Sequence, residues 1–551
     1  MAEWTDYDGA MFPTLSAAQI ARLTPLGIRR RVAEGEIVLD PGTVPRGIFL
    51  VLEGRLEVVS SSRSGEVRIT SHGPGQFTGE VNILTGRPTS VRTRAAAPSE
   101  LLEVDQATLR HIVQTDPELG DVFLRAFVRR RARLIAEALW DLILLGSRYS
   151  AASLRLKEFL SRNGHPYTYV EVERDPGVQA LMEHFGINPE DIPVLMCHDR
   201  PVLRNPSNAE VAKRLGFNVE IDGGRVYDLV VIGAGPAGLG TAVYAASEGL
   251  DVLVLEGNAP GGQAGSSSRI ENYLGFPLGV TGQELAGRAF VQAEKFGAQV
   301  AIARVASALN CGRQPFSLEC AGAEAVRARA VVVASGAEYR RLSLPNLGQF
   351  EGVGVYYGAT RLEAQLCADE EIAIVGGGNS AGQAAVFLSG IAKHVHVVVR
   401  GTGLAESMSR YLIRRIEESA AISLRTRTEI VSLEGAGHLE HLAWSHRETG
   451  ATETRDIRHL FSMTGASPNT AWLQGCVALD DKGFVKTGAD LTPEDLEAEH
   501  WPLVRRPYLF ETSVPKVFAV GDVRSGSVKR VASAVGEGSV VVQLVHRVLA
   551  E

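Results

Sequence analysis

Two glycine-rich segments of this 551-residue chain have the residue types and spacing of turns that bind nucleotide phosphates. In the first, VYDLVVIGAGPAGLG, an apolar strand pattern runs into Gly233, Gly235 and Gly238 before an alanine-rich helix pattern. Such a turn needs the first glycine to leave the strand sharply, the second to admit a pyrophosphate, and the third to bring helix and sheet together. The helix then directs unpaired N–H groups and the positive end of its dipole at the phosphates.

The residue at the end of the next strand indicates which nucleotide each turn binds. After the first turn, the strand DVLVLE ends at Glu256, where a carboxylate can accept hydrogen bonds from a ribose 2′-hydroxyl. The second turn, EIAIVGGGNSAG, has Gly376 and Gly378, with Ala381 at the close-packing position, and the strand after it ends at Arg400. A guanidinium would bind a 2′-phosphate that a carboxylate would repel, so this turn favours NADPH over NADH. Two such turns in tandem predict a flavoenzyme with a dinucleotide on each side of an electron-transfer step.

Composition places the chain among ordinary, mildly acidic soluble proteins. Hydrophobic residues make up 45% and the formal net charge is −8, which gives no reason to expect nucleic acid as a partner. The first residues lack the regions of a signal peptide and no apolar run could cross a bilayer, so we expect a cytoplasmic protein with no membrane partner. The cysteines include no C-x-x-C pair, which predicts neither a disulfide scaffold nor a metal site and suggests a reducing compartment. They are Cys197, Cys311, Cys320, Cys367 and Cys476.

Changes in pattern along the chain predict a multidomain protein. Residues 1–140 contain short alternating strands separated by glycines and then a helix, which is typical of an antiparallel β-roll. Four arginines of that helix, at positions 129, 130, 131 and 133, are expected to form a solvated face. Residues 141–222 alternate strand and helix patterns and predict a small α/β domain. After a short linker, a larger α/β block runs from Val226 to the C-terminus and contains both turns.

The motifs of this last block occur in a specific order. After GAGPAG come APGGQAG, IENYLGFP, VVVASGAEYR, GGGNSA, TGASPNT and VFAVGDVRSGSVKRVASAVGEG. In this order the block resembles the low-molecular-weight thioredoxin reductases over its whole length. The resemblance implies an FAD-binding domain made of residues 226–344 and 468–551, with an NAD(P)-binding domain of residues 345–467 between them. It also implies a homodimer.

The two turns and the resemblance together assign the cofactor-binding residues. The resemblance makes Asp522 a ligand of the ribityl chain and puts Arg530 at the start of a helix whose dipole would stabilise negative charge on the reduced flavin. The residues expected to bind FAD are Gly233, Gly235, Pro236, Ala237, Gly238, Glu256, Gly261, Gly262, Gln263, Asn272, Gly521, Asp522, Arg530, Val531 and Ala532. Those expected to bind NADP(H) are Gly376, Gly378, Asn379, Ser380, Ala381 and Arg400.

The block departs from the family at the redox-active cysteines. The family has a C-x-x-C pair just before the NADP turn, after a Gly-Val-x-Tyr stretch. In GVGVYYGATRLEA, Gly358 and Arg361 stand at those positions, with Ala359 and Thr360 between them. Disulfide reduction requires one thiolate that attacks and a second thiol that resolves, so the dithiol relay is expected to be absent. Cys367 follows alone and is expected to be a buried small residue. No catalytic side chain is assigned.

The small domain resembles a thioredoxin or glutaredoxin fold that has lost its chemistry. Its element order matches, and Pro193 stands at the position of the cis-proline that faces the active site in that fold. The redox motif should begin the first helix, where the chain has Ser150-Ala151-Ala152-Ser153. Serine hydroxyls form no disulfides, so we expect a scaffold without redox activity.

The N-terminal roll resembles a cyclic-nucleotide-binding domain. Gly79 and Glu80 match the start of the phosphate cassette, whose acid binds the ribose 2′-hydroxyl. Thr89 replaces the arginine that pairs with the cyclic phosphate. Loss of that contact should cost roughly 2–5 kcal/mol of binding free energy. We therefore expect a different small ligand, or none.

These features predict an FAD-dependent oxidoreductase that takes electrons from NADPH and passes them to an external acceptor, either a protein or a small molecule, without a redox dithiol. The N-terminal domain would regulate it by favouring one of two conformations. One alternative is a redox or NADPH sensor or scaffold with little turnover. Another is a thioredoxin-disulfide reductase that uses an atypical cysteine arrangement.

Overall fold

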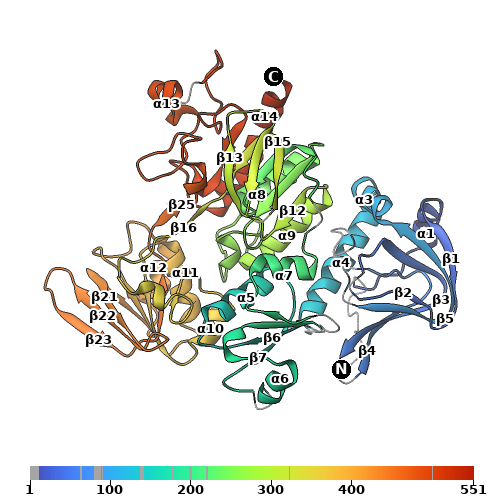
Figure 1. Cartoon of the computed structure of the whole chain (residues 1–551), viewed down its shortest axis with the longest axis horizontal. Helices are drawn as coiled ribbons and strands as arrows, with labels where there is room; N and C mark the ends of the chain where they lie inside the picture. Colours follow the sequence, from blue (N-terminus) through green and yellow to red (C-terminus); the bar gives the residue numbers. More distant parts are fainter. Residues whose placement is uncertain are drawn as a thin grey trace.

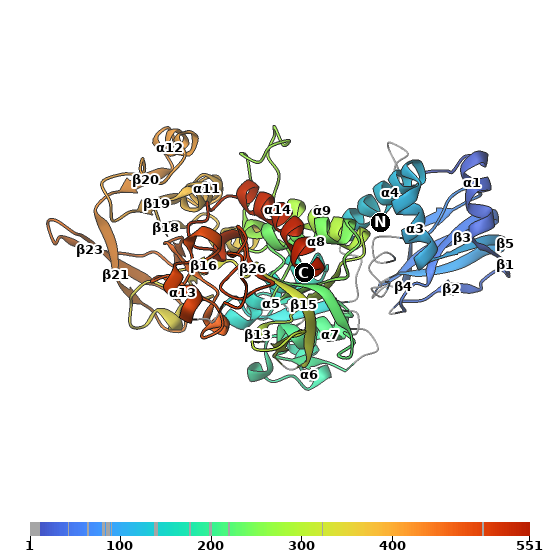
Figure 2. The same ribbon diagram turned by 90° about the horizontal axis from the view of Figure 1, so that it is seen from above.

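The parts of the molecule are arranged around a central α/β domain that contains the first glycine turn. The computed structural model describes residues 11–41, 43–62, 65–79, 83, 89, 91–136, 142–175, 178–197, 201–218, 221–321, 323–498 and 501–551. The N-terminal roll lies at one end, the domain with the second glycine turn lies at the other, and the small α/β domain lies below the centre (Figure 1). Seen from above, the same parts form an elongated molecule (Figure 2).

The N-terminal roll is an antiparallel sheet closed by helices. Strand β5 (Arg92–Asp105) pairs with β1 (Ile28–Val32), β2 (Ile37–Leu39) and β3 (Gly47–Ser62), and β3 also pairs with β4 (Gly65–His72). Alternate residues of the long strands, such as Ile48 and Leu102, point inward and are fully buried. They pack with helix α3 (Gln106–Thr115), helix α4 (Pro117–Ala136) and, at the start of the roll, helix α1 (Ala17–Leu23).

One arginine of α4 contradicts the expected solvated face. Arg130 is buried, and its guanidinium donates to the carbonyl oxygens of Met11, Phe77 and Gly79 at 2.8–3.0 Å. It also lies 4.8 Å from the ring centroid of Phe77. The guanidinium therefore joins the helix to the roll, because backbone carbonyls and an aromatic ring together compensate its desolvation.

The small α/β domain has a four-stranded sheet in the order β7-β6-β8-β9. Strands β6 (Leu142–Gly146) and β7 (Thr168–Glu171) are parallel, whereas β8 (Val194–Cys197) runs antiparallel to β6 and to β9 (Leu203–Arg204). Its helices are α5 (Ala151–Arg162), α6 (Val178–Phe185) and α7 (Asn208–Leu215). The sequence pattern had not indicated the two-residue strand β9. The cis peptide bond expected at Ile192–Pro193 is confirmed.

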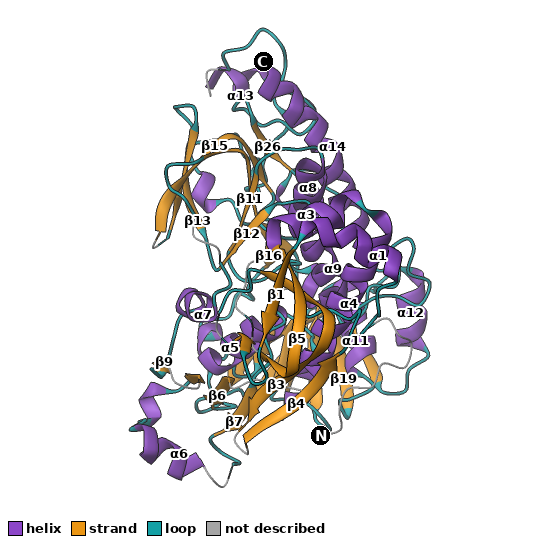
Figure 3. Cartoon of the chain, turned by 90° about the vertical axis from the view of Figure 1, so that its right-hand side faces the viewer, coloured by secondary structure: helices purple, strands orange, loops and turns teal. Residues whose placement is uncertain are grey.

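The first glycine turn belongs to a seven-stranded sheet. Its parallel core consists of β12 (Gln299–Ile302), β11 (Val252–Glu256), β10 (Val226–Ile232), β15 (Ala323–Val333) and β26 (Val517–Ala519), extended by the antiparallel strands β14 (Phe316–Cys320) and β13 (Ala306–Asn310). Residues Leu229–Ile232 and Val331–Val333 form continuous apolar runs because both faces of this sheet are covered. The helices α8 (Pro236–Ser247), α9 (Gly282–Lys295) and α14 (Val531–Ala550) lie against it, and Figure 3 shows them grouped on one side.

The second glycine turn belongs to a separate five-stranded parallel sheet. Its order is β17 (Val355–Tyr356), β24 (His459–Ser462), β18 (Glu371–Val375), β19 (His394–Val398) and β20 (Ile422–Arg425). Helices α10 (Arg361–Leu366), α11 (Asn379–Leu388) and α12 (Arg410–Glu417) connect these strands. A three-stranded antiparallel sheet of β21 (Thr428–Glu434), β22 (His441–His446) and β23 (Thr452–Arg455) extends away from the centre (Figure 1).

The chain passes between the two nucleotide domains twice, through neighbouring strands. Strands β16 (Ala337–Tyr339) and β25 (Ala466–Pro468) pair with each other in antiparallel register. Beside them, Ser335 Oγ donates to the carbonyl oxygen of Asn469 at 2.8 Å, and Asn469 Nδ2 donates back to the carbonyl of Ser335 at 3.0 Å. The second domain is therefore an insertion held by a two-stranded connection. A further short helix, α13 (Pro493–Ala498), lies in the returning part of the first domain.

Helix α5 of the small domain packs against both nucleotide domains. Near its C-terminal end, Arg162 donates to the carbonyl oxygen of Gly262 at 2.7 Å and Asn163 donates to that of Asn258 at 3.1 Å. Closer to its start, Leu154 packs in the apolar cluster of the second nucleotide domain. The roll makes a separate contact, in which Gln114 of α3 donates to the carbonyl oxygen of Lys295 at 2.9 Å at the end of α9.

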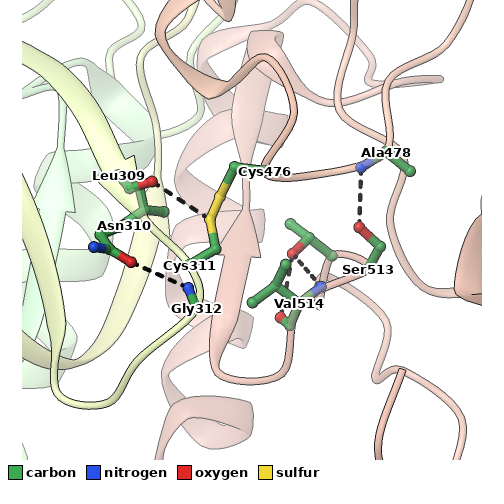
Figure 4. The surroundings of a disulfide bond; sticks show 9 residues. Leu309, Asn310, Cys311, Gly312, Cys476, Ala478, Ser513 and Val514 are labelled. Carbon is green, nitrogen blue, oxygen red and sulfur yellow. Dashed lines mark hydrogen bonds between the residues drawn. A yellow bond between two sulfur atoms is a disulfide. The ribbon is translucent and has the colours of Figure 1, made fainter. Parts of the chain in front are cut away.

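A disulfide bond between Cys311 and Cys476 corrects the expectation from the cysteine spacing (Figure 4). Cys311 directly follows β13, and Cys476 lies in the loop after the short turn Ala471–Leu473, with the two Cα atoms 5.9 Å apart. The two cysteines are separated by 165 residues, so no local motif marks the pair. The bond joins the edge of the large sheet to the segment that returns from the inserted domain.

Removing this disulfide should weaken the first nucleotide domain. Cys311→Ser is expected to lower the free energy of unfolding by about 2–4 kcal/mol, because the cross-link restricts a long loop of the unfolded chain. Urea unfolding followed by far-ultraviolet circular dichroism measures the change. Wild-type protein treated with a reductant should unfold like the variant, whereas identical midpoints for oxidised wild type and variant would contradict the bond.

Candidate active site

The two glycine turns face one cavity. Its volume is about 2330 Å³, and its wall includes residues 233 and 235–237 of the first turn and residues 376–380 of the second. A site for one drug-sized ligand typically measures about 300–1,000 Å³, so this cavity has room for two dinucleotides. The cavity lies between the two nucleotide domains and is closed on a third side by α5 of the small domain.

The glycines of the first turn divide into two kinds. A side chain at Gly233 would overlap the carbonyl oxygen of Ala334, and one at Gly238 would overlap the carbonyl oxygen of Gly233. Gly233 also has φ +102°, a backbone conformation that favours glycine. At Gly235 the nearest protein atom to an added Cβ is the Cα of Gly262, 3.9 Å away. Gly235 therefore keeps open a space at the N-terminus of α8, where a pyrophosphate would accept hydrogen bonds from the first N–H groups.

Glu256 is buried at the end of β11 and forms part of the cavity wall. Its carboxylate accepts hydrogen bonds from the backbone N–H groups of Ala234, Asn258 and Ala259 at 2.7–3.1 Å. Burial raises the pKa of Glu256, and these donors oppose that shift by stabilising the ionised form. The carboxylate thus joins the first glycine turn to the loop after β11. Because Glu256 also lines the cavity, its oxygens can still accept a hydrogen bond from a ribose.

The loop after β11 is held against the first turn. The N–H of Gly261 donates to the carbonyl oxygen of Ala234 at 2.7 Å, and Gln263 Nε2 donates to the carbonyl oxygen of Ala337. Gly262 and Gln263 line the cavity, and Asn272 lies exposed on its rim.

The returning chain completes this wall at the start of α14. Gly521, with φ +74°, donates from its N–H to Glu537 at 2.6 Å, and Asp522 follows at the cavity surface. Burial raises the pKa of Asp522, and the nearby Lys529 ammonium opposes the shift. Arg530 is the N-cap of α14, and residues 530–532 line the cavity. A positive helix end therefore points into the space in which a flavin ring is expected.

The second turn has the same construction. A side chain at Gly376 would come within 2.5 Å of the carbonyl oxygen of Met463, whereas Gly378, the N-cap of α11, has open space before it. Ala381 is fully buried behind the turn. Asn379 Oδ1 accepts a hydrogen bond from the N–H of Ser409 at 2.8 Å, which joins the turn to α12. Arg400 is exposed after β19 and lines the cavity, as a contact to a 2′-phosphate requires.

Most of the predicted cofactor residues are brought together at this cavity. Every one of them lines it except Gly238, Gly261, Ala381 and Gly521, which pack behind its wall where a larger side chain would meet protein atoms. Sequence reasoning missed Tyr339 of β16, which lines the cavity near both Ser380 of the second turn and Asp522 of the first domain. It also missed Glu158 and Arg162, which α5 brings to the wall.

Gly358 and Arg361 lie in this wall. Thr360 between them is the N-cap of α10, and Arg361 is exposed as the first residue of that helix. A Cβ added to Gly358 would lie 3.9 Å from the Cβ of Ser266, so a small side chain would fit there. This part of the wall therefore faces the loop predicted to hold the flavin.

None of the five cysteines is among the described residues that line the cavity. Cys367 is fully buried at the end of α10, and burial raises the pKa of its thiol to about 12. Its thiolate form is therefore negligible near neutral pH, as expected for a structural residue. The Cys311–Cys476 disulfide likewise lies outside the cavity wall.

The N-terminal roll has a smaller cavity of about 50 Å³. Gly79, Thr89, His72 and Arg130 are among the residues that line it, while Glu80 lies outside the described residues. Burial and the positive charge of Arg130 hold the pKa of His72 well below its ordinary value, so His72 is neutral. Most of the pocket lining is apolar, and its polar residues are three threonines, a neutral histidine and one arginine that is bonded to backbone carbonyls.

Comparison with known proteins agrees with this geometry. Residues 227–538 match the model of the family described as pyridine nucleotide-disulphide oxidoreductase. The chain belongs to this family. Residues 29–116 match the cyclic nucleotide-binding domain, so the protein joins such a domain to the oxidoreductase.

Individual relatives within the family are thioredoxin reductases. That of Mycolicibacterium smegmatis is 32% identical over 326 residues, which cover 59% of this chain and 97% of the relative. That of Bacillus subtilis is 29% identical over 327 residues, covering 59% and 96%. The crystal structure of the T. acidophilum thioredoxin reductase superposes with a TM-score of 0.53 at 26% identity, covering 59% of this chain and all of that one.

The oxidoreductase fold and cofactors expected from the sequence are therefore confirmed. The protein is an FAD-dependent NADPH oxidoreductase of the thioredoxin reductase type, and the open glycine turns fit both dinucleotides. When bound, the flavin supplies hydride and electron transfer, and the described residues supply binding and orientation. No helix within the described ranges is both long and apolar enough to cross a membrane.

Substitution of the two kinds of glycine in the first turn should affect different properties, namely FAD binding in one case and the stability of the fold in the other. Gly235→Val places a branched side chain in open space, so we expect a folded protein that has lost nearly all of its FAD. Gly238→Ala introduces a clash with backbone and should instead lower the stability of the fold by about 1–3 kcal/mol. The absorbance of bound flavin, measured with the circular dichroism melting curve, separates these results. Full FAD content in Gly235→Val would contradict the placement of the pyrophosphate.

Proposed function

We propose that this oxidoreductase passes electrons from NADPH through FAD to an external acceptor without a redox dithiol. The observation that carries the proposal is the wall segment at Gly358 and Arg361, because neither residue has the sulfur that disulfide exchange requires. The positions of the five cysteines support it, since none of them lines the cavity. An acceptor would therefore react at the flavin within this cavity.

The small domain fits the same proposal. Its sheet order and the cis bond before Pro193 support a thioredoxin-like module. Ser150 caps α5 by accepting a hydrogen bond from the N–H of Ser153 at 3.2 Å, and Ser153 Oγ in turn accepts from Ser147 at 3.1 Å. Both hydroxyls thus have structural roles at the place where a redox motif would begin. We infer that the module docks on the nucleotide domains, forms one wall of the cavity and carries no electrons.

The N-terminal domain provides a route for regulation. Its helix α3 meets the end of α9 through the Gln114–Lys295 contact, and the start of α9 contacts the loop predicted to bind FAD through the Gly282 N–H, which donates to the carbonyl oxygen of Ser267 at 2.9 Å. A small ligand in the roll that moved α3 and α4 would therefore act on the flavin domain through α9.

Arg400 should determine the preference for NADPH. Arg400→Ala is expected to lower kcat/KM for NADPH by about 10- to 100-fold, because a charged hydrogen bond contributes about 1.5–3 kcal/mol. The value for NADH should hardly change. Arg427→Ala, which removes an exposed arginine paired with Glu448 outside the cavity wall, is the matched control. Equal efficiency of the wild type with NADPH and NADH would refute the assignment.

Reinstating the missing cysteines tests the proposed function directly. The wild type should bleach its flavin with NADPH and reduce an artificial dye, yet show almost no reduction of thioredoxin disulfide. The double variant Gly358→Cys/Arg361→Cys should gain disulfide reduction at least about tenfold above wild type, because both thiols would reach the cavity. Gly358→Ser/Arg361→Ser is the control with similar volume. Robust disulfide reduction by the wild type would overturn the proposal.

A further inference from the structure

Two carboxyl groups meet where the small domain touches the second nucleotide domain. Glu158 comes from α5 and Glu363 from α10, and both belong to the wall of the nucleotide cavity. Glu363 lies two residues beyond Arg361, in the segment where related enzymes carry their redox cysteines. The two side chains are close enough to share a hydrogen bond.

Glu363 has one satisfied and one unsatisfied oxygen. The side chain is only 1% exposed, and its Oε2 accepts hydrogen bonds from the N–H of Thr360 at 2.6 Å and from the Thr360 hydroxyl. Its Oε1 is buried and has no hydrogen-bond partner among the described residues. A buried carboxylate oxygen without a donor is costly, so a proton on the neighbouring carboxyl would find an acceptor there.

The surroundings of Glu158 favour that proton. Burial raises the pKa of Glu158 to about 8, with further contributions from the charge of Glu363 and from the hydrogen bond to it. Arg162 opposes the shift, and Lys157 on the same helix lies within electrostatic range of Glu363. Tyr356 and Cys367 lie within electrostatic range of Glu363 and are neutral, because burial raises the pKa of each. Glu158 therefore keeps its proton at neutral pH, next to the charge of Glu363.

We propose that Glu158 and Glu363 share one proton at the cavity wall and donate it to the acceptor that is reduced there. The inference rests on the proposed function. The overall reaction, NADPH + H⁺ + A → NADP⁺ + AH₂, moves one hydride, which is two electrons and one proton, from the nicotinamide to A. The pair supplies the second hydrogen as a proton and regains it from solvent. Through Glu363, the pair therefore places a proton donor in the segment where related enzymes carry the redox dithiol.

This assignment specifies a class of acceptor. A proton donor is useful for an organic two-electron oxidant whose oxygen atoms are protonated on reduction, such as a quinone. It is of no use to a one-electron metal complex such as ferricyanide, which takes up no proton. The pair therefore favours a small quinone-like acceptor over a one-electron carrier protein.

The shared proton can be observed without turnover. The infrared spectrum of oxidised holoprotein should contain the carbonyl band of a protonated carboxylic acid, which disappears as the pH rises through about 8. The band should be absent at pH 7 from Glu158→Gln, and subtraction of that variant cancels bands from other buried acids. Glu363→Gln keeps the cap of α10, since glutamine also suits that position, and should lower the pH at which the band is lost. Glu338→Gln, which changes an exposed carboxylate at the same cavity, should leave the band unchanged.

Turnover then tests the donor role. With a water-soluble benzoquinone, Glu158→Gln should lower kcat by about 100-fold, the usual effect of a general acid. With ferricyanide, its kcat should stay within about twofold of wild type. Absence of the carboxylic acid band would overturn the inference, and so would equal losses with both oxidants, which would indicate a structural role. Failure of NADPH to bleach the wild-type flavin while the band is present would instead contradict the proposed function.

Discussion

The site depends on backbone-to-backbone contact between helices and sheets. At Gly238 the first turn of α8 lies directly against the end of β10, and at Gly538 helix α14 lies against the backbone of α8, so any side chain at either position would overlap main-chain atoms. Because the elements approach this closely, the N-termini of α8 and α14 open into the same cavity. Helix dipoles and free N–H groups can then act on anionic cofactors at short range, in addition to the charged side chains of the wall.

Docking of the small domain determines which residues line one wall of the site. Leu154 packs with the second nucleotide domain while Arg162 bonds to Gly262 of the first, so α5 bridges the two. That bridge brings α5 to the same cavity wall as the segment after Gly358, in which Glu363 is buried and Arg361 is exposed. A helix without redox residues thus changes the chemistry of the wall that it covers.

Much of the fold could be predicted because its signals are local. The glycine turns, Glu256, Arg400 and the strand that follows Pro193 are each defined within about 30 residues, and turn geometry requires those residue types. The features that were missed depend on contacts between distant parts of the chain. The burial of Arg130 depends on carbonyl groups of a roll that folds around it, the Cys311–Cys476 bond closes a gap of 165 residues, and Glu158 meets Glu363 only because α5 docks on α10. The roles assigned to the individual residues expected to bind FAD and NADP(H) remain predictions.

The paired strands β16 and β25 give the molecule a modular character. Since the ingoing and outgoing segments of the inserted domain run side by side, that domain can be exchanged as a cassette without opening the seven-stranded sheet. A related protein with a different inserted domain would keep the domain that is predicted to bind FAD. Such an exchange could change the electron donor that the protein binds without changing the flavin domain that accepts the electrons.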